Sequence, residues 1–409
     1  MKHTIILIAL FLLSFPVVMG MGYQNHFQSP KSTAMGMAGT SLNLDASAVF
    51  FNPGAMSALP GRLRFAAGLH GIQSSTKFQL EQPSVYQAIT DNPIVLPFYL
   101  YASASVTPRL SAGLAINEPF GTRVTWEEGW AGRFLTKQSV LQSLNIQPTF
   151  SYQLLDNLFV GAGLSILFGK TEMIRKLPVQ DDNHEGELSI KGNATTWGIN
   201  AGLLWWPASD LRLGISYRSQ MKLEFDDAQA IFKVPSLVET SFPSPNTVST
   251  SIPLPASLDA GIAWDASERW MWVVNLNYVF WNVFENRQLD FAINSSVLVD
   301  ENNPSEYSNT FSLRIGTQFH WQENLVLRAG TFYNPSPVNP NYFTPENPSL
   351  NSLGFTTGVS FMPFDGFSID MALAVIMGIQ EEVRYTPGNF NGIYKSRNII
   401  PGLGVSYHF

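Results

Sequence analysis

The chain has 409 residues with 24 basic and 31 acidic side chains, so its net charge is −7, and only 13% of its residues are charged. This is about half of the usual charged fraction of roughly 25%. Hydrophobic residues make up 45% and aromatic residues 13%, which excludes a disordered chain and a nucleic-acid-binding protein with a basic face. Without cysteine there is no disulfide framework or thiolate site, and the six scattered histidines predict no metal site and no cofactor.

The N-terminal residues 1–20 have the pattern of a secretory signal peptide. Lys2 precedes an apolar core that runs from Ile5 to Leu13, and small residues follow before Met21, where we place the cleavage. The alternative is a transmembrane anchor, but the core is short and Pro16 interrupts its continuation. No later stretch approaches the roughly 18 apolar residues of a spanning helix, so an exported membrane protein with this sequence must be a closed barrel.

Residues 21–61 differ from the rest of the chain, because they are rich in small and apolar residues but lack a strand pattern. This composition predicts a compact element that packs against something else. A wide barrel leaves a lumen, and an N-terminal hatch is one way to fill it. The alternative is a periplasmic extension with no gating role.

From residue 62 to residue 409 the chain repeats segments in which apolar residues alternate with small or polar ones. Leu211, Leu213 and Ile215, for example, alternate with Arg212 and Gly214. This period of two predicts strands with two different environments, and about fourteen of them form a transmembrane antiparallel β-barrel, an all-β fold. The predicted strands lie near 62–73, 97–107, 109–118, 140–153, 157–172, 186–206, 210–225, 250–264, 268–284, 307–321, 324–334, 350–361, 366–382 and 395–409.

The connections between these segments alternate between tight turns and long loops. The turns at 107–109, 155–157 and 322–324 are short, whereas the connections at 226–249 and 334–349 are long and polar. An outer-membrane barrel has this asymmetry, with short periplasmic turns and long outer loops. Tryptophans flank the short turns, as at a membrane interface; they are Trp205, Trp206, Trp264, Trp270, Trp272 and Trp321. A secreted soluble β-protein is the alternative, and the signal sequence and turn asymmetry argue against it.

Several motifs, in their order along the chain, resemble the FadL/TodX family of outer-membrane transporters for hydrophobic compounds. Asp45-Ala46-Ser47 followed by Phe51-Asn52-Pro53-Gly54-Ala55 is similar to the family's hatch signature, usually Asn-Pro-Ala, with Gly54 in place of the alanine. Glu118-Pro119-Phe120-Gly121 and Trp130-Ala131-Gly132-Arg133 resemble a family loop pattern. The aromatic end, Tyr407-His408-Phe409, resembles the signal by which such barrels are recognised for assembly.

The resemblance implies a fourteen-stranded barrel with an N-terminal hatch in the outer membrane of a Gram-negative bacterium. It also implies passive transport of long-chain fatty acids or similar hydrophobic compounds, and a side opening at an inward kink of the third strand, near Gly113 or Asn117-Glu118-Pro119. The implied partners are hydrophobic small molecules (fatty acids, hydrocarbons), outer-membrane lipid, lipopolysaccharide and the barrel assembly machinery. We expect a monomer that binds no nucleic acid.

Three groups of residues are candidates for the transport mechanism. Asn52, Pro53 and Gly54 encode a defined turn, which makes them the candidate gate. Loop residues Trp126, Trp130, Phe134 and Leu135, with Arg133, are candidates for an apolar capture surface, as are Ile89, Ile94, Val95 and Leu96; alternatively these are loop cores. Strand alternation points Arg212, Arg218, Arg314 and Arg328 into the lumen, where an arginine could bind a carboxylate. Alternatively they form a structural network with Asp259, Asn275, Asn277 and Asp370.

Catalysis is not expected. A hydrolase would need a serine, a histidine and an acid that converge, and the histidines lie in no nucleophile motif. Two functions therefore remain: a passive transporter for hydrophobic molecules gated by the hatch, and a structural or adhesive surface barrel without transport.

Overall fold

The computed structural model describes residues 22–181 and 185–409, in which fourteen antiparallel strands form the closed wall of a barrel. Each strand pairs with the next, and β21 closes the circle against β1. In order, the wall strands are β1 (Leu63–His70), β4 (Phe98–Ser105), β5 (Leu110–Asn117), β7 (Gln138–Leu155), β8 (Leu158–Gln180), β9 (Glu185–Ala208), β10 (Leu211–Arg218), β13 (Ser257–Ser267), β14 (Trp270–Val279), β17 (Thr310–Gln322), β18 (Leu325–Asn334), β19 (Ser352–Phe364), β20 (Phe367–Tyr385) and β21 (Phe390–His408).

Shorter strands and 3₁₀ helices extend the wall at the end where the long loops lie. These strands are β2 (Gln73–Leu80), β3 (Gln87–Ile89), β6 (Gly121–Thr125), β11 (Met221–Lys233), β12 (Asn246–Leu254), β15 (Asn286–Phe291) and β16 (Glu301–Pro304). The 3₁₀ helices are η2 (Ser236–Ser241), η3 (Trp281–Val283) and η4 (Thr386–Gly388). No helix within the described ranges is both long and apolar enough to cross a membrane.

The prediction of a fourteen-stranded all-β barrel is confirmed, with local differences in the strand boundaries. The predicted strand 210–225 is broken at residues 219–220 into β10 and β11, and 250–264 is broken at residues 255–256 into β12 and β13. Pro255 explains one break, since it has no N–H to donate to the ladder. The predicted signal peptide, residues 1–20, lies outside the described residues.

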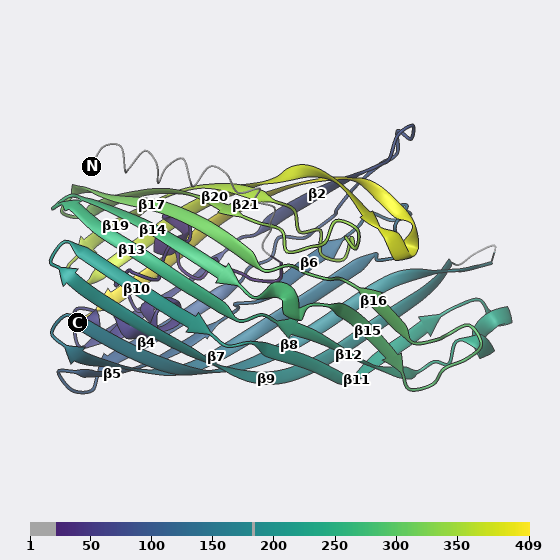
Figure 1. The fold of residues 1–409 in the computed structure, drawn as a ribbon, viewed down its shortest axis with the longest axis horizontal. Coiled ribbons are helices and arrows are strands. Elements are labelled where there is room, and N and C mark those ends of the chain that lie inside the picture. Colours follow the sequence, from purple (N-terminus) through teal and green to yellow (C-terminus); the bar gives the residue numbers. More distant parts are fainter. Residues whose placement is uncertain (1–21, 182–184) are drawn as a thin grey trace.

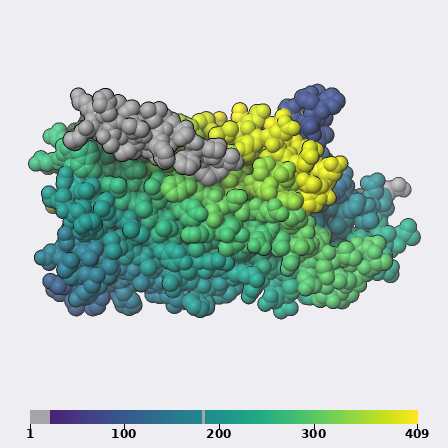
Figure 2. Space-filling view, viewed as in Figure 1, coloured from purple at the N-terminus to yellow at the C-terminus, as the bar shows by residue number. Residues whose placement is uncertain are grey.

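The tight turns lie at one end of the barrel and the long loops at the other, as the sequence predicts (Figure 1). The short-turn end also holds the C-terminus. At the opposite end the outer segments form separate projections, with the yellow outer part of β21 on one side and green segments on the other (Figure 2). The molecule is therefore polarised along the barrel axis.

The wall presents apolar side chains outward and small or polar side chains inward. Outward-facing, exposed residues include Phe65, Leu100, Leu164, Ile215, Ile262, Ile315, Phe355 and Leu403. Inward-facing, buried residues include Ser103, Asn145, Thr149, Asn200, Asn275, Arg314, Thr356 and Asp370. This alternation is typical of a barrel whose outer surface faces lipid.

Five of the six tryptophans near the short turns are exposed on the outside, as expected for an interfacial belt; they are Trp205, Trp264, Trp270, Trp272 and Trp321. The prediction is wrong for Trp206. Its ring packs against Phe159, with 4.9 Å between ring centroids, at the edge of a buried cluster that the N-terminal segment and the wall form together. Adjacent strand residues face opposite sides, so Trp205 and Trp206 cannot both face lipid.

Residues 22–61 fold inside the barrel, where the purple ribbon lies within the wall near the short-turn end (Figure 1). They contain helix α2 (Pro30–Ala34), helix α3 (Ala48–Phe51) and the 3₁₀ helix η1 (Pro53–Ala58). Most of these side chains are buried, including the fully buried Met35, Met37 and Met56. We refer to residues 22–61 as the N-terminal segment; its role as a separate hatch domain stays a prediction.

Candidate functional site

Asn52 anchors the turn at the start of η1 with three hydrogen bonds. Its side-chain oxygen accepts from the N–H of Gly54 at 3.0 Å, and its amide nitrogen donates to the carbonyls of Thr40 at 2.6 Å and Leu203 at 2.9 Å. Asn52 is fully buried. One side chain therefore caps a helix, ties two parts of the N-terminal segment together and joins both to the wall.

A pair of wall glycines forms the surface on which this turn rests. Gly161 of β8 and Gly202 of β9 lie opposite each other in the ladder. A Cβ atom on Gly202 would lie 2.1 Å from the Asn52 Oδ1, and a Cβ atom on Gly161 would lie 2.5 Å from the Pro53 carbonyl carbon. Such separations are too short for any side chain, so glycine is required for this close approach.

The same contact explains why glycine occupies position 54. A Cβ atom there would lie 2.8 Å from the carbonyl oxygen of Gly202 and 2.9 Å from that of Phe159. These are backbone atoms of paired strands, which cannot move aside. Glycine at position 54 is therefore matched to a turn that lies directly against the backbone of the wall.

Two more cross-strand glycine pairs seat other turns of the N-terminal segment. They are Gly214 with Gly261, which lie under Thr40 and Ser41, and Gly316 with Gly330, which lie under Met35 and Gly36. The Gly-rich inner face that is visible in the sequence thus follows the path of the N-terminal backbone along the wall.

Buried charges also join the N-terminal segment to the wall. The ammonium of Lys31 in α2 lies 3.2 Å from Asp45 and 3.5 Å from Asp370 of β20, and it donates to the hydroxyl of Ser406 at 2.8 Å. Burial opposes ionisation of Asp45, but Lys31 and two hydrogen bonds from Ser47 lower the pKa of Asp45 below its ordinary value. The tie is therefore ionic at neutral pH.

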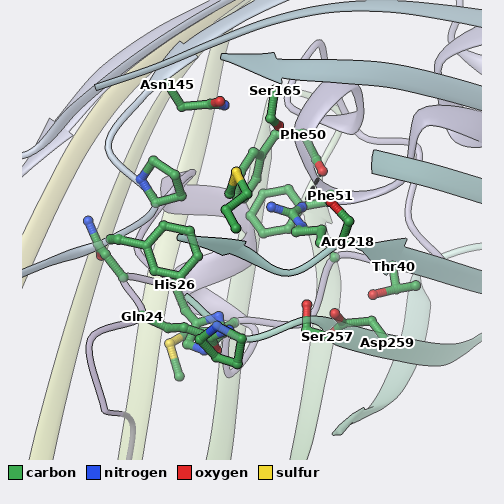
Figure 3. A pocket seen from close by; sticks show the side chains of 18 of the residues that line it. Gln24, His26, Thr40, Phe50, Phe51, Asn145, Ser165, Arg218, Ser257 and Asp259 are labelled. Atoms are coloured by element: carbon green, nitrogen blue, oxygen red, sulfur yellow. Dashed lines mark hydrogen bonds between the residues drawn. The ribbon is translucent and has the colours of Figure 1, made fainter. Parts of the chain in front are cut away.

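A cavity of about 60 Å³ lies between the N-terminal segment and the inner face of the wall (Figure 3). We call it the inner cavity. Its apolar lining includes Phe50, Phe51, Met37 and Ile199, and its charged lining consists of Arg218, Arg314 and Asp259. Two guanidinium groups against one carboxylate give the lining a net charge of +1. An apolar cavity with this charge suits a hydrophobic molecule that carries an anionic head group.

Arg218 lies over the ring of Phe50, with 3.6 Å between the guanidinium carbon and the ring centroid (Figure 3). It also donates a hydrogen bond to the carbonyl of Phe50. Arg314 donates to the carbonyl of Met37 at 3.2 Å and to the side chain of Asn277 at 3.3 Å. Both arginines therefore contact the N-terminal segment as well as the cavity.

The His26 ring also lines the inner cavity and lies 3.2 Å from Arg314 through Nε2. Burial, and then the charges of Arg314 and Arg218, hold the pKa of His26 well below its ordinary value. The imidazole is therefore neutral at neutral pH, and a ring nitrogen can accept a hydrogen bond from Arg314.

A second cavity of about 230 Å³, which we call the outer cavity, lies toward the long loops. It is lined by the start of the N-terminal segment, by residues 92–97, by β6 and by residues 347–350. Its apolar lining includes Phe27, Ile72, Val95, Val124, Leu141 and Ile376. Gln24, Asn25 and Phe120 line both cavities, so they form the partition between them.

The wall is interrupted beside the outer cavity, between β5 and β6. Both strands pair with β7, but Glu118, Pro119 and Phe120 fall out of the ladder between them. There the chain pairs with the N-terminal segment: Asn25 donates its N–H to the carbonyl of Pro119 at 2.8 Å, and Gly121 donates to that of Tyr23 at 2.9 Å. This is the region of the third strand in which the family resemblance places a kink.

Two of the predicted capture residues form the core of the outer loops. The rings of Trp126 and Trp130 are stacked with 4.2 Å between centroids, and both are buried. Phe134 is exposed beneath the Arg133 guanidinium, and Arg133 pairs with Glu185 at 2.9 Å. Neither cavity is lined by these residues or by the half-buried Leu135. This placement favours the loop-core alternative, and their role in the ligand path stays a prediction.

The four predicted lumen arginines fall into two pairs. Arg218 and Arg314 line the inner cavity. Arg212 instead pairs with Asp265 at 2.6 Å, and Arg328 donates to Gln318 at 2.8 Å and to Ser360, which in turn donates to Asp370. Neither Arg212 nor Arg328 lines the inner cavity or the outer cavity. This placement favours the structural-network alternative for these two arginines.

Sequence reasoning did not identify the residues that divide the lumen or tie the N-terminal segment to the wall. Gln24, Asn25 and His26 begin three residues after the predicted cleavage and resemble an ordinary polar linker. Lys31 has one usable signal: it and Asp45 are the two charged residues of a segment that is rich in small and apolar residues, and a buried charge needs a partner.

Comparison with known proteins gives a consistent picture. Residues 16–409 match the family model described as outer membrane protein transport protein (OMPP1/FadL/TodX). A long-chain fatty acid transport protein from Escherichia coli O157:H7 is 20% identical over 411 residues, which covers 89% of both chains. Outer membrane protein P1 from Haemophilus influenzae is 20% identical over 307 residues, which covers 68% of this chain and 65% of that protein.

Solved structures share the same architecture. A FadL homologue from Pseudomonas aeruginosa superposes with a TM-score of 0.83 and 18% identity, covering 95% of this chain and all of that one. The Pseudomonas putida toluene transporter TodX superposes with a TM-score of 0.73 and 21% identity, covering 96% of this chain and all of that one. At these identities the likeness establishes the fold.

Proposed function

Because the chain belongs to the OMPP1/FadL/TodX family of outer membrane transport proteins, we propose that it is a passive channel for long-chain fatty acids or similar hydrophobic anions. The observation that carries this proposal is the pair of cavities in series, which meet at Gln24, Asn25 and Phe120. The outer cavity is lined by apolar and neutral polar residues together with one cation, Arg123, and one carboxylate, Glu118, whose charges balance, whereas the inner cavity adds Arg218 and Arg314 and has a net charge of +1. An aliphatic chain followed by a carboxylate matches this order.

The cavities are small for such a ligand. Drug-sized ligands occupy pockets of about 300 to 1,000 Å³, whereas the outer and inner cavities measure about 230 and 60 Å³. Passage of a long acyl chain therefore requires that the N-terminal segment move. We propose that this segment is the hatch, and that Asn52, Pro53 and Gly54 form the contact that must be released.

Beside the apolar clusters that the hatch shares with the wall, a set of local polar contacts joins the two and is suited to reversible exchange. Asn52, Ser57 and Lys31 each bond to the wall, and glycine pairs seat its turns without interlocking side chains. Neutral hydrogen bonds such as those of Asn52 and Ser57 contribute only about 1 kcal/mol each on a net basis, and hydrogen bonds to a charged group such as Lys31 about 1.5 to 3 kcal/mol, so a few can be exchanged within a transport cycle.

The relatives also include a toluene transporter, which makes an uncharged aromatic ligand the second candidate. The two arginines of the inner cavity favour the anion. A surface barrel without transport is the remaining alternative.

We propose no catalytic activity, because diffusion through weak sites in series requires no reaction. We expect a monomer surrounded by outer-membrane lipid and lipopolysaccharide, and inserted by the barrel assembly machinery.

A disulfide between the hatch and the wall tests this proposal. The hydroxyls of Ser57 in η1 and Ser151 in β7 are 2.7 Å apart, so two cysteines at these positions are close enough to bond. The chain has no other cysteine. We expect oxidised Ser57→Cys/Ser151→Cys protein to stop uptake of radiolabelled hexadecanoate, and reduction to restore it.

The single variants Ser57→Cys and Ser151→Cys are the controls, and both should transport with and without oxidant. Heat-dependent migration on gels should show that the locked barrel is folded. Normal uptake by the locked protein would contradict hatch gating. If the unmodified protein and all variants gave no more uptake than cells that lack the barrel, the result would favour the surface-barrel alternative.

A further inference from the structure

A third cavity, of about 120 Å³, lies at the short-turn end between the N-terminal segment and the wall. We call it the exit cavity. Its hatch side includes Leu44, Ala46 and Leu59, and its wall side includes Phe367, Ser368 and Ser406. Gly366, in the turn between β19 and β20, lines it as well, which places the cavity at the predicted periplasmic face. It shares no lining residue with the inner or outer cavity.

The lining of the exit cavity carries two buried cations and one buried carboxylate. Lys31, Arg64 and Asp45 all line it, and Lys31 and Arg64 are 8% and 3% exposed. Arg64 donates to the carbonyls of Leu59, Pro60 and Gly61. Its Nη1, however, is buried without a hydrogen-bond partner in the described part of the chain. A buried guanidinium nitrogen without a partner is a costly feature that a ligand oxygen would relieve.

We propose that the exit cavity binds the anionic head group of the outgoing ligand, with the lining cations Lys31 and Arg64 as its partners. This inference rests on the proposed transport of hydrophobic anions. The apolar neighbours Leu44, Leu59 and Phe367 would contact the first carbons of the chain. An uncharged hydrocarbon would gain nothing from the two cations, so the cavity favours carboxylates over neutral molecules of equal length.

The present partners of Lys31 can release it without being left unpaired. Asp45 keeps hydrogen bonds from the N–H of Ser47 at 2.9 Å and from its hydroxyl at 2.5 Å. Asp370 keeps the hydroxyls of Ser368, at 3.0 Å, and Ser360. A ligand carboxylate can therefore replace these partners at Lys31 while every buried carboxylate stays hydrogen-bonded.

This exchange would loosen the hatch. In the structure Lys31 joins helix α2 to Ser406 of β21 and Asp370 of β20. When the carboxylate of a ligand binds the ammonium of Lys31, the links from Lys31 to Ser406 and to Asp370 both weaken. The ligand at the exit cavity would thus favour release of the hatch on the side where the ligand leaves.

Photolabelling of the unmodified full chain tests the site directly. The probe is hexadecanoic acid with a diazirine next to the carboxylate, and the control probe is hexadecanol with a diazirine at the same carbon. We expect mass spectrometry to find the acid attached around residues 44–46, 59–65 or 367, and at least tenfold less attachment of the alcohol there. Labelling of the inner cavity alone, around Phe50 and Arg218, would overturn the exit site but leave the proposed function intact. Labelling of neither cavity would contradict both.

Variants of Lys31 sharpen the test. Lys31→Gln should reduce labelling of the exit cavity by the acid at least tenfold, and Lys31→Arg should retain it. Labelling of the inner cavity should be unchanged in both. Lys137→Gln, which removes a lysine paired with Glu128 in the outer loops, is the matched control. Equal labelling of the exit cavity in Lys31→Gln and the unmodified protein would overturn the proposal, and if Lys31→Gln does not fold, the two probes on the unmodified protein still decide it.

Discussion

The side chain of Asn52 donates a hydrogen bond to the backbone carbonyl of Leu203 in β9 at 2.9 Å. This bond crosses from the N-terminal segment to the barrel wall at a point where the wall has no side chain of its own, because Gly202 and Gly161 lie beneath the turn. The contact is thus made between the side-chain amide of Asn52 and the backbone of the wall. A change of Asn52 can therefore weaken the contact without altering the barrel.

We predict that Asn52→Ala loosens the hatch. The change leaves the carbonyls of Thr40 and Leu203 and the N–H of Gly54 without their partner, and an unsatisfied buried group costs about 1 to 3 kcal/mol. Asn52→Asp should have a similar effect, because a carboxylate cannot donate to the two carbonyls. Conductance of single channels in planar bilayers should rise in both variants, whereas Asn324→Ala at an exposed short turn should leave it unchanged.

Gly202→Ala should disturb the same contact from the side of the wall. Its methyl group would lie 2.1 Å from Asn52 Oδ1 and 2.9 Å from Pro53 Cδ, so the turn must shift. Gly71→Ala is the matched control, since its nearest neighbour would be 3.6 Å away. Protease digestion of the N-terminal segment should accelerate only in Gly202→Ala. Equal protease resistance of both variants would show that the turn does not rest on this glycine pair.

Removal of a cavity arginine should weaken anionic ligands selectively. We expect Arg218→Gln to reduce the affinity for hexadecanoate by about 1.5 to 3 kcal/mol, the range for a hydrogen bond to a charged group, and to leave hexadecanol nearly unaffected. Arg328→Gln is the comparison, because Arg328 bonds to Gln318 and Ser360 and lines neither the inner nor the outer cavity. It should lower thermal stability and leave the ratio of the two affinities unchanged. A selective loss in Arg328→Gln would contradict this assignment.

Acid should weaken the tie between Lys31 and Asp45. The pKa of Asp45 is lowered in the docked hatch, so its contribution is complete above its ordinary pKa of about 3.9 and is lost as the pH falls through the lower docked value. Channel conductance should therefore be constant from pH 7 to about 5 and rise below about pH 4. In Asp45→Asn, conductance should already be raised at pH 7. The part of the conductance increase at acid pH that comes from protonation of Asp45 should be absent in this variant.

The barrel should lie with its short turns in the periplasm. Ser209→Cys in the turn between β9 and β10 should resist an impermeant thiol reagent on intact cells, and Ser296→Cys in the exposed connection between β15 and β16 should react. The same assignment places the loops near Asp181, Asn246, Asn303 and Asn341 outside, and the turns near Pro108, Asp156, Ser267 and Glu323 inside. Reaction at Ser209→Cys without reaction at Ser296→Cys would reverse the orientation.

The local residue pattern was enough to predict the strands and which of their faces is polar. A period of two is a local property, so alternation around Leu211, Leu213 and Ile215 was sufficient to predict which side chains point outward. The same alternation placed Arg212, Arg218, Arg314 and Arg328 on the lumen side. Tight turns and long loops separated the two ends of the barrel, because connection length is also read directly from the chain.

Which inward residues meet could be seen only in the folded barrel. Alternation gives the face of a strand but not its height in the barrel, which depends on strand tilt and on how the sheet closes. For that reason the sequence did not distinguish Arg218, which lines a cavity, from Arg328, which is bonded within the wall. Lys31 and Asp370 are 339 positions apart and meet because a buried cation requires an anion. The contact between the glycine pairs and the turns of the hatch is likewise seen only in the folded barrel, where the wall surrounds residues 22–61.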